Sequence, residues 1–328
     1  MPPLLPAKPF NSYDQLLELL KTRGMLIEND ARAQRKLAQV GYYRLSGFWF
    51  PCRVITRDAD GDPISKFPKQ PWILSRKESF WEGTTFNAVF DLYTFDKRLR
   101  LLMLDALERI EIFIRSIIAH ELGHISPIAY RDETLIADKF KTPYEGTAKS
   151  KWEDWTARHN QKLATSKDDC ILWHREQSKE IPIWVAIETW DFGLLTKYYN
   201  MLKWHHKDTI AKQIDPAIAK QFGNWLNSLN ILRNKCAHHA RIWNMRLPNP
   251  LPLPNLPCFS PVSASRDAPF KIHGLITIIW FLMKKIGPNS DWRSRVSAEL
   301  ATFPKLPNCA LRAMGSPAGK NRHSVLFP

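Results

Sequence analysis

The sequence reads Leu229-Asn230-Ile231-Leu232-Arg233-Asn234-Lys235-Cys236-Ala237-His238-His239-Ala240-Arg241 at the stretch that decides the fold of this chain. Extended to residues 222–243, this stretch contains no proline and predicts one helix of about twenty residues. When successive residues are placed about 100° apart, the apolar side chains share a single arc: Phe222, Trp225, Leu226, Leu229, Leu232, Cys236 and Ala240. That pattern is typical of a helix that packs one face against a hydrophobic core.

A second stripe on the predicted helix is polar and consists of Asn227, Asn230, Asn234, His238 and Arg241. An exposed helix face usually carries lysine and glutamate, whereas this stripe holds amides, an imidazole and a guanidinium, and no carboxylate. Each of these side chains can donate hydrogen bonds to oxygen. The stripe therefore predicts contact with an anion.

The candidate catalytic residues are Arg233, Asn234 and His238. Histidine exchanges protons near neutral pH, and arginine can hold two phosphate oxygens at once. Asn234 lies one helical turn before His238, so its amide can orient the imidazole or a ligand oxygen. These residues could cleave a phosphodiester without metal: the RNA 2′-hydroxyl would attack the adjacent phosphate, His238 would move a proton and Arg233 would neutralise the developing charge.

A structural role for Arg233 is the alternative. The helical wheel places it inside the apolar arc, roughly 140° from His238, where a buried arginine needs a carboxylate partner. Residues 86–122 predict a second, long helix, in which Glu111 and Arg115 lie one turn apart beside the apolar stripe. We predict that Glu111 pairs with Arg233 and that Arg115 points toward the same polar pocket. A plain intrahelical ion pair between Glu111 and Arg115 is the other possibility.

The net charge of the chain is +15, from 47 Lys and Arg against 32 Asp and Glu. A surplus of this size favours a polyanionic partner, most commonly nucleic acid. An anionic membrane surface is the alternative, but no basic amphipathic anchor stands out. The longest apolar run, residues 275–283, is too short to span a bilayer, and the first residues lack the pattern of a signal peptide. We therefore expect no membrane association.

The five cysteines are scattered and form no C-x-x-C pair: Cys52, Cys170, Cys236, Cys258 and Cys309. This excludes a disulfide framework or a zinc ribbon and predicts a cytoplasmic protein.

The remaining helical patterns predict an all-α fold, with helices near residues 12–22, 30–40, 147–166, 182–203, 270–286 and 290–303. Residues 246–257 hold five prolines and predict an extended strap. The basic segment 305–328 is expected to add attraction for nucleic acid. We divide the chain into an N-terminal helical and aromatic segment (1–84), a helical core (85–245) and a C-terminal region with the strap, helices and basic tail (246–328).

Tyr42, Tyr43 and Arg44 form an aromatic and basic cluster that could stack on bases or contact phosphate. The alternative is that these side chains belong to the core.

The segment His120-Glu121-Leu122-Gly123-His124 matches the H-E-x-x-H pattern of zinc proteases, in which Glu121 would activate a water. The glycine within the motif and Pro127 indicate that the helix ends here, and no third histidine follows at the expected spacing. Glu145 or Glu153 would have to complete the site. A zinc metalloprotease is therefore the least favoured function, and we predict no metal site.

Five collinear blocks, together covering about residues 8–244, resemble the Abi family of bacterial abortive-infection proteins, the AbiD/AbiF-like group. They are Lys8-Pro9-Phe10; Gly41-Tyr42-Tyr43-Arg44-Leu45-Ser46-Gly47; Leu92-Tyr93-x-Phe95-Asp96-x-x-Leu99-Arg100 with Ile110-Glu111-x-x-x-Arg115; Pro182-x-Trp184-x-x-x-Glu188; and Leu232-Arg233-Asn234-x-Cys236-Ala237-His238-His239-x-Arg241-x-Trp243-Asn244.

That family is related to the HEPN superfamily, whose R-x(4–6)-H motif corresponds here to Arg233 and His238. The resemblance implies a HEPN-like helical bundle, here with extra N-terminal helices and a C-terminal helical extension. It further implies a homodimer in which two motifs meet to form a metal-independent, cofactor-free endoribonuclease for phage defence. His239 and Arg241 would then support the site, and a regulatory small RNA is a further expected partner. The alternative is a non-catalytic RNA-binding or toxin-partner protein.

Overall fold

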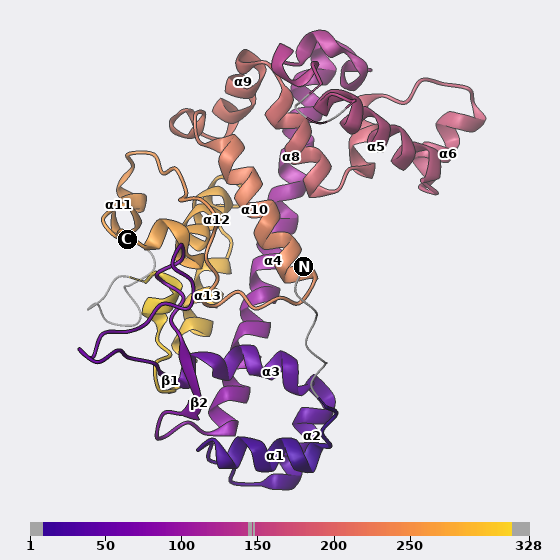
Figure 1. Cartoon of the computed structure of the whole chain (residues 1–328). Coiled ribbons are helices and arrows are strands. Elements are labelled where there is room, and N and C mark those ends of the chain that lie inside the picture. The colour runs from indigo at the N-terminus through magenta and orange to yellow at the C-terminus, as the bar shows by residue number, and fades with distance from the viewer. Residues whose placement is uncertain (1–8, 144–145, 147, 317–328) are drawn as a thin grey trace. The chain divides into compact units, whose positions relative to one another are not determined.

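A computed structural model describes residues 9–143, 146 and 148–316 of this chain. The fold is all-α, as the sequence predicts: the described residues form thirteen α-helices and one two-stranded sheet. They divide into two compact units, one with residues 9–99 and Ala298–Ala313, the other with Arg100–Ser297 and residues 314–316. The longest helix, α4 (Phe86–Ile125), contributes its first part to the first unit and the rest to the second (Figure 1).

The first unit begins with the helices α1 (Tyr13–Thr22), α2 (Asp30–Val40) and α3 (Tyr42–Trp49). Ser12 caps α1, since its side chain accepts a hydrogen bond from the Gln15 N–H and the Gln15 side chain accepts one from the Ser12 N–H. The core between these helices consists of side chains with no exposed area, among them Leu20, Leu37, Leu45 and Trp49.

A small sheet occupies a region where the sequence pattern predicts no strand. β1 (Arg53–Ile55) pairs antiparallel with β2 (Arg76–Phe80). The Arg76 guanidinium donates hydrogen bonds to the carbonyls of Pro51 (2.9 Å) and Arg53 (2.7 Å). Because strands this short are held by such tertiary contacts, no periodicity in the sequence reveals them.

Gly41 joins α2 to α3 with φ +88° and ψ 138°. Residues that have a Cβ rarely adopt this backbone conformation. We expect Gly41→Ala to lower the free energy of unfolding by about 1–3 kcal/mol, measured by urea denaturation. The control is Gly287→Ala at the C-cap of α12 (Ile272–Ile286), where φ is −146° and no described atom lies within 4 Å of an added Cβ. If both variants lost the same free energy of unfolding relative to the wild type, alanine at position 41 would not be strained, against this prediction.

The second unit contains the later helices of the chain. Besides α12 and most of α4 they are α5 (Lys151–Thr165), α6 (Asp169–Glu176), α7 (Ile183–Ala186), α8 (Phe192–Met201), α9 (Trp204–Ile214), α10 (Phe222–Ala237), α11 (Ser260–Ser263) and the start of α13 (Trp292–Ala301). α8 and α10 pack side by side (Figure 1). This packing joins one face of α8 and one face of α10 into a single surface.

Two sequence predictions in this unit are wrong. The helix predicted over 182–203 is interrupted, because Asp191 accepts a hydrogen bond from the Leu194 N–H (2.8 Å) and starts α8 as a new helix. The predicted helices leave residues 204–221 without one, yet Trp204–Ile214 form α9, and in its first turn His205 is exposed and His206 is buried. The tertiary packing of α9, rather than its polar composition, determines this burial.

The predicted proline-rich strap forms no helix before Pro257, where a 3-10 helix begins, and it packs onto the helices. The Leu247 N–H donates to the Phe270 carbonyl (2.7 Å), and the Trp225 indole N–H donates to the Pro252 carbonyl (2.7 Å). α12, which the strap contacts through Leu251, buries every side chain from Ile272 to Met283. In the described part of the chain, no helix combines the length and the apolar character needed to cross a membrane.

Candidate functional site

Helix α10 carries the predicted catalytic residues but ends earlier than the sequence pattern predicts. It spans Phe222–Ala237, and His238 is its C-cap residue with φ −90° and ψ 16°. The next residue, His239, has φ +56°, and the Ala240 N–H donates to the Lys235 carbonyl (2.8 Å). This six-to-one hydrogen bond after a left-handed residue is the Schellman motif, which closes a helix.

The early helix end corrects the predicted positions of Ala240 and Arg241, which lie beyond the turn and not on the helical faces expected for them. Glycine normally marks such a turn, and a histidine in its place gives no signal in the sequence. The Arg100 guanidinium of α4 donates to the Ala240 carbonyl (3.4 Å) and so contacts the segment after the turn. His238 is left exposed at the end of α10.

The left-handed conformation of His239 leads to a stability prediction. We expect His239→Gly to unfold with a free energy about 1–2 kcal/mol higher than His239→Ala, because only alanine has a Cβ that clashes in this conformation. Both variants lose the histidine side chain, so the difference between their free energies of unfolding reports the cost of the left-handed backbone at residue 239. Chemical denaturation of the two proteins measures it, and equal free energies would show that residue 239 is not left-handed in solution.

The predicted pair between Arg233 and Glu111 is present. The Arg233 Nε lies 4.0 Å from Glu111 Oε2, and the Glu111 side chain is 10% exposed whereas that of Arg233 is 36% exposed. Arg233 is therefore paired, as the structural alternative requires, but it is not buried. A contact this long and this open leaves the guanidinium accessible to a second anion.

Arg115 is held far more firmly than Arg233. Its Nη2 donates to Glu111 Oε1 (2.5 Å) and to the Trp190 carbonyl (2.6 Å), and its Nη1 lies 3.5 Å from Glu188 Oε2. The intrahelical pair with Glu111 thus exists, but it belongs to a larger network that joins α4 to the segment between α7 and α8. Arg115 fixes Glu111, and Glu111 in turn positions Arg233.

Burial raises the pKa of Glu111 above its usual value, and the charges of Arg115 and then Arg233 oppose that shift. The nearby carboxylate of Asp191 also raises the Glu111 pKa. Burial raises the pKa of Asp191 as well, but hydrogen bonds from the Leu194 N–H and from Lys162 outweigh it and hold that pKa below the usual value. The site therefore contains two carboxylates with opposite pKa shifts beside Arg233.

Asn234 lines a pocket to which the Arg233 side chain does not contribute. This pocket, of about 550 Å³, is also lined by Asn230 of α10 and by Arg158 and Lys197 from α5 and α8. Asn230 and Asn234 of the polar stripe therefore face a hollow with more cations than carboxylates, whereas His238 and Arg241 do not line it. Its third asparagine, Asn227, lines an adjoining pocket.

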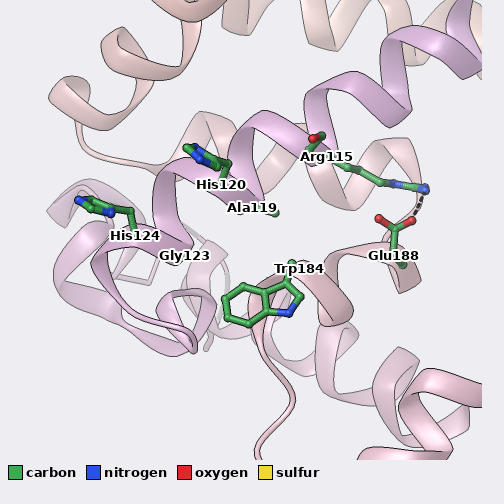
Figure 2. Close-up of a pocket in the computed structure, with 8 residues that line it drawn as sticks. Arg115, Ala119, His120, Gly123, His124, Trp184 and Glu188 are labelled. Carbon is green, nitrogen blue, oxygen red and sulfur yellow. Dashed lines mark hydrogen bonds and ion pairs between the residues drawn. The ribbon is translucent and has the colours of Figure 1, made fainter.

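A further pocket, of about 510 Å³, follows one face of α4 (Figure 2). In Figure 2 Arg115 reaches Glu188, His120 and His124 follow each other along the helix, and the Trp184 indole lies against Gly123. A Cβ at position 123 would lie 3.3 Å from that indole, so the glycine permits this close packing.

The same pocket contains the two histidines of the H-E-x-x-H pattern but not a zinc site. Glu121 accepts a hydrogen bond from the Gln213 side chain (3.1 Å) and does not line the pocket. Glu153, a proposed additional ligand, is used in the capping box of α5, and Glu145 lies outside the described residues. Nowhere in residues 9–143, 146 and 148–316 do three or more His, Cys, Asp or Glu side chains gather as metal ligands.

The structure places Tyr42, Tyr43 and Arg44 on α3, in the first compact unit, whereas Arg233 belongs to the second. The Tyr42 hydroxyl accepts a hydrogen bond from Arg23 (3.2 Å), and its ring packs edge-on against Trp49. Tyr43 is 83% exposed. Tyr42 thus contributes to packing, and contact of this cluster with RNA stays a prediction.

The site includes residues that the sequence did not identify as functional. Glu188 bonds Arg115, Trp184 lines the pocket of Figure 2, and Arg158 and Lys197 line the hollow beside Asn234. The block Pro182-x-Trp184-x-x-x-Glu188 was a usable signal for the first two. For Arg158 and Lys197 the sequence contains no signal, because only the packing of α5 and α8 brings them together.

Most of the residues described in this site lie in a part of the chain that matches a known protein family. Residues 35–244 match the model of the family described as Abi-like protein. No curated protein and no solved structure matches the chain. The matched region covers more than half of the sequence and contains Glu111, Arg115, Glu188, Arg233 and His238. This chain therefore belongs to the Abi-like protein family.

Proposed function

We propose that this protein is a metal-independent endoribonuclease that acts in abortive-infection defence. Its membership of the Abi-like family supports the defence role. One observation carries the catalytic part: Arg233 is loosely held by Glu111 and lies five residues before the exposed His238, and its neighbour Asn234 lines a hollow with several cations. The resemblance of this motif to the HEPN pattern supports RNA as the substrate.

The reaction proceeds by attack of the ribose 2′-oxygen on the adjacent phosphorus. The O2′–P bond forms while the P–O5′ bond breaks, and this yields a 2′,3′-cyclic phosphate and a 5′-hydroxyl. His238 takes the proton from the 2′-hydroxyl as a general base or gives one to the departing O5′ as a general acid, and water completes the other proton transfer. Arg233 neutralises the charge that develops on the phosphoryl oxygens, and the Asn234 amide donates a hydrogen bond to the same group.

Glu111 and Arg115 act as positioning residues in this scheme. Glu111 accepts a short hydrogen bond from Arg115 but lies 4.0 Å from Arg233. A phosphate can therefore replace Glu111 as the anion that Arg233 binds. The hydrogen bond between Arg115 and Glu111 then stays in place. The bidentate geometry of arginine with phosphate favours this exchange.

We further propose a homodimer in which the motifs of two copies meet, as the HEPN resemblance implies. The exposure of His238 supports this arrangement, because a second copy can approach it. Analytical ultracentrifugation is expected to show a dimer, and the specific activity should fall on dilution below the dissociation constant. A monomer with undiminished specific activity would rule out a shared site.

The decisive experiment incubates the purified protein with total RNA in EDTA and maps the ends of the products. We expect cleavage that leaves 2′,3′-cyclic phosphate and 5′-hydroxyl ends, and no cleavage of the 2′-deoxy substrate, which lacks the nucleophile. Products with 5′-phosphate ends, or cleavage that stops in EDTA, would refute this mechanism. RNA binding without cleavage would favour the non-catalytic RNA-binding or toxin-partner function.

A further inference from the structure

Helices α5, α8 and α10 enclose a groove that combines cations with amide side chains. It consists of the pocket of about 550 Å³ beside Asn234 and a pocket of about 380 Å³ that contains Asn227. Both pockets are lined by Arg158 and Lys197, so they adjoin, and each also contains one carboxylate, Asp154 or Asp191. We call this surface the asparagine groove and define it by Arg158, Lys197, Asn200, Asn227, Asn230 and Asn234.

Close packing of α8 on α10 builds one wall of the groove. The Asn200 side chain donates hydrogen bonds to the Gly223 carbonyl (3.3 Å) and to Asn227 Oδ1 (3.2 Å). A Cβ at position 223 would collide with the Asn200 amide oxygen, so only glycine allows this approach. The amides of Asn200 and Asn227 are thereby fixed in orientation, which is a property of a prepared binding surface.

The cations of the groove are available to a ligand. Arg158 and Lys197 are both exposed, and neither forms a hydrogen bond or an ion pair with another residue that the structure describes. Lys162, at the end nearest Asn234, differs, because it pairs with Asp191 (3.0 Å). Four cations and two carboxylates line the two pockets, and this surplus of positive charge raises the local concentration of anions.

We propose that the asparagine groove binds single-stranded RNA and guides it to the cleavage site. Arg158 and Lys197 contact successive phosphates, and the asparagine amides contact the edges of unpaired bases. A single strand fits better than a duplex, because unpaired bases expose edges that amides can read, whereas duplex RNA is contacted mainly by shape across about 16 base pairs.

The groove contains one of the proposed catalytic residues. Asn234 lines the groove and also belongs to the motif with Arg233 and His238. A strand that follows the groove therefore brings a phosphate next to Arg233. In this respect the inference rests on the proposed nuclease function, but RNA binding itself can be measured without cleavage.

The test measures binding of a fluorescent 2′-O-methyl RNA 15-mer, which has no free 2′-hydroxyl and cannot be cleaved by the proposed mechanism. The dissociation constant is determined by anisotropy at several salt concentrations for the wild type and for Arg158→Gln/Lys197→Gln. Each phosphate contact with a single strand contributes about −0.7 to the slope of log K against log salt. We expect the double variant to flatten the slope by about 1.4 and to bind at least tenfold more weakly at low salt.

The matched control is Lys220→Gln/Arg266→Gln, which removes two exposed cations of the same compact unit that do not line the groove. It should keep the wild-type slope and affinity. The proposal is overturned if the groove variant behaves like this control, or if the wild type does not bind the 15-mer. It is also overturned if duplex DNA binds as tightly and loses the same affinity, because the groove would then be a general polyanion site.

Cleavage assays separate a failure of this proposal from a failure of the nuclease function. We expect the groove variant to lose cleavage of long RNA by a much larger factor than cleavage of a dinucleotide, because a long strand makes more contacts along the groove. If the wild type cleaves neither substrate while the groove variant still loses binding, the groove stands and the nuclease function falls. If the groove variant lost dinucleotide cleavage by the same factor as cleavage of long RNA, Arg158 and Lys197 would act in the reaction itself. That result would contradict the proposal.

Discussion

Replacement of His238 by alanine is expected to lower the rate of RNA cleavage by about 10²- to 10⁴-fold, the usual contribution of a general acid–base residue. The fold should persist, because the side chain is exposed and the residue has φ −90° and ψ 16°, which alanine adopts readily. Cleavage of a labelled RNA in EDTA measures the rate, and thermal denaturation verifies the fold. A loss of activity with an unchanged melting temperature assigns the imidazole to the reaction.

The control for this variant is His205→Ala, which removes another exposed histidine of the same compact unit from the first turn of α9. It is expected to cleave RNA like the wild type. Should His238→Ala retain full activity with the same product ends, another residue must move the proton, and the proposed mechanism would be wrong. The size-exclusion profile should not change, because the substitution removes no buried contact.

Replacement of Arg115 by alanine is expected to cost about 3–5 kcal/mol of stability, the effect of leaving one member of a buried ion pair without its partner. The Arg115 and Glu111 side chains are only 16% and 10% exposed, and Arg115 also bonds the Trp190 carbonyl. Urea denaturation at neutral pH measures the loss. For comparison, Lys212→Ala breaks the more exposed pair with Asp208 on α9 and should cost at most about 0.5 kcal/mol.

The loss in Arg115→Ala should depend on pH in a defined direction. Burial already raises the pKa of Glu111, and removal of the adjacent cation raises that pKa further. Between the unfolded pKa of a glutamate, about 4.3, and this raised value, the folded state binds more protons than the unfolded state. Stability therefore falls as pH increases through that window, so the loss should be smaller at pH 5 than at pH 8.

A double variant tests whether the unpaired charge is the cause. Glu111→Leu/Arg115→Met replaces the pair by apolar side chains and should recover most of the stability, as buried ion pairs often can be replaced without loss. RNA cleavage should nevertheless stay low, because Arg233 has lost the carboxylate that positions it. If stability does not recover, the hydrogen bond to the Trp190 carbonyl, and not the charge, dominates the role of Arg115.

Periodicity alone determined the class of this fold and the apolar face of each long helix. It predicted the core arc of α10 from Phe222 to Cys236, the stripe of α4 and a proline-rich strap without α-helix, because these depend on residues that are close in sequence. The pairing of Glu111 with Arg233 also followed from local pattern, since a charge beside an apolar stripe needs a partner when the stripe is buried.

Tertiary structure alone decided where helices end and which polar faces meet. α10 stops at Ala237 because His239 adopts a left-handed conformation that no residue type in the motif announces. Arg158 and Lys197 share one groove only because α5 and α8 pack beside α10. The physical reason is general: the hydrophobic pattern states which face of a helix is buried, but the fit of side chains between helices selects the partner of that face.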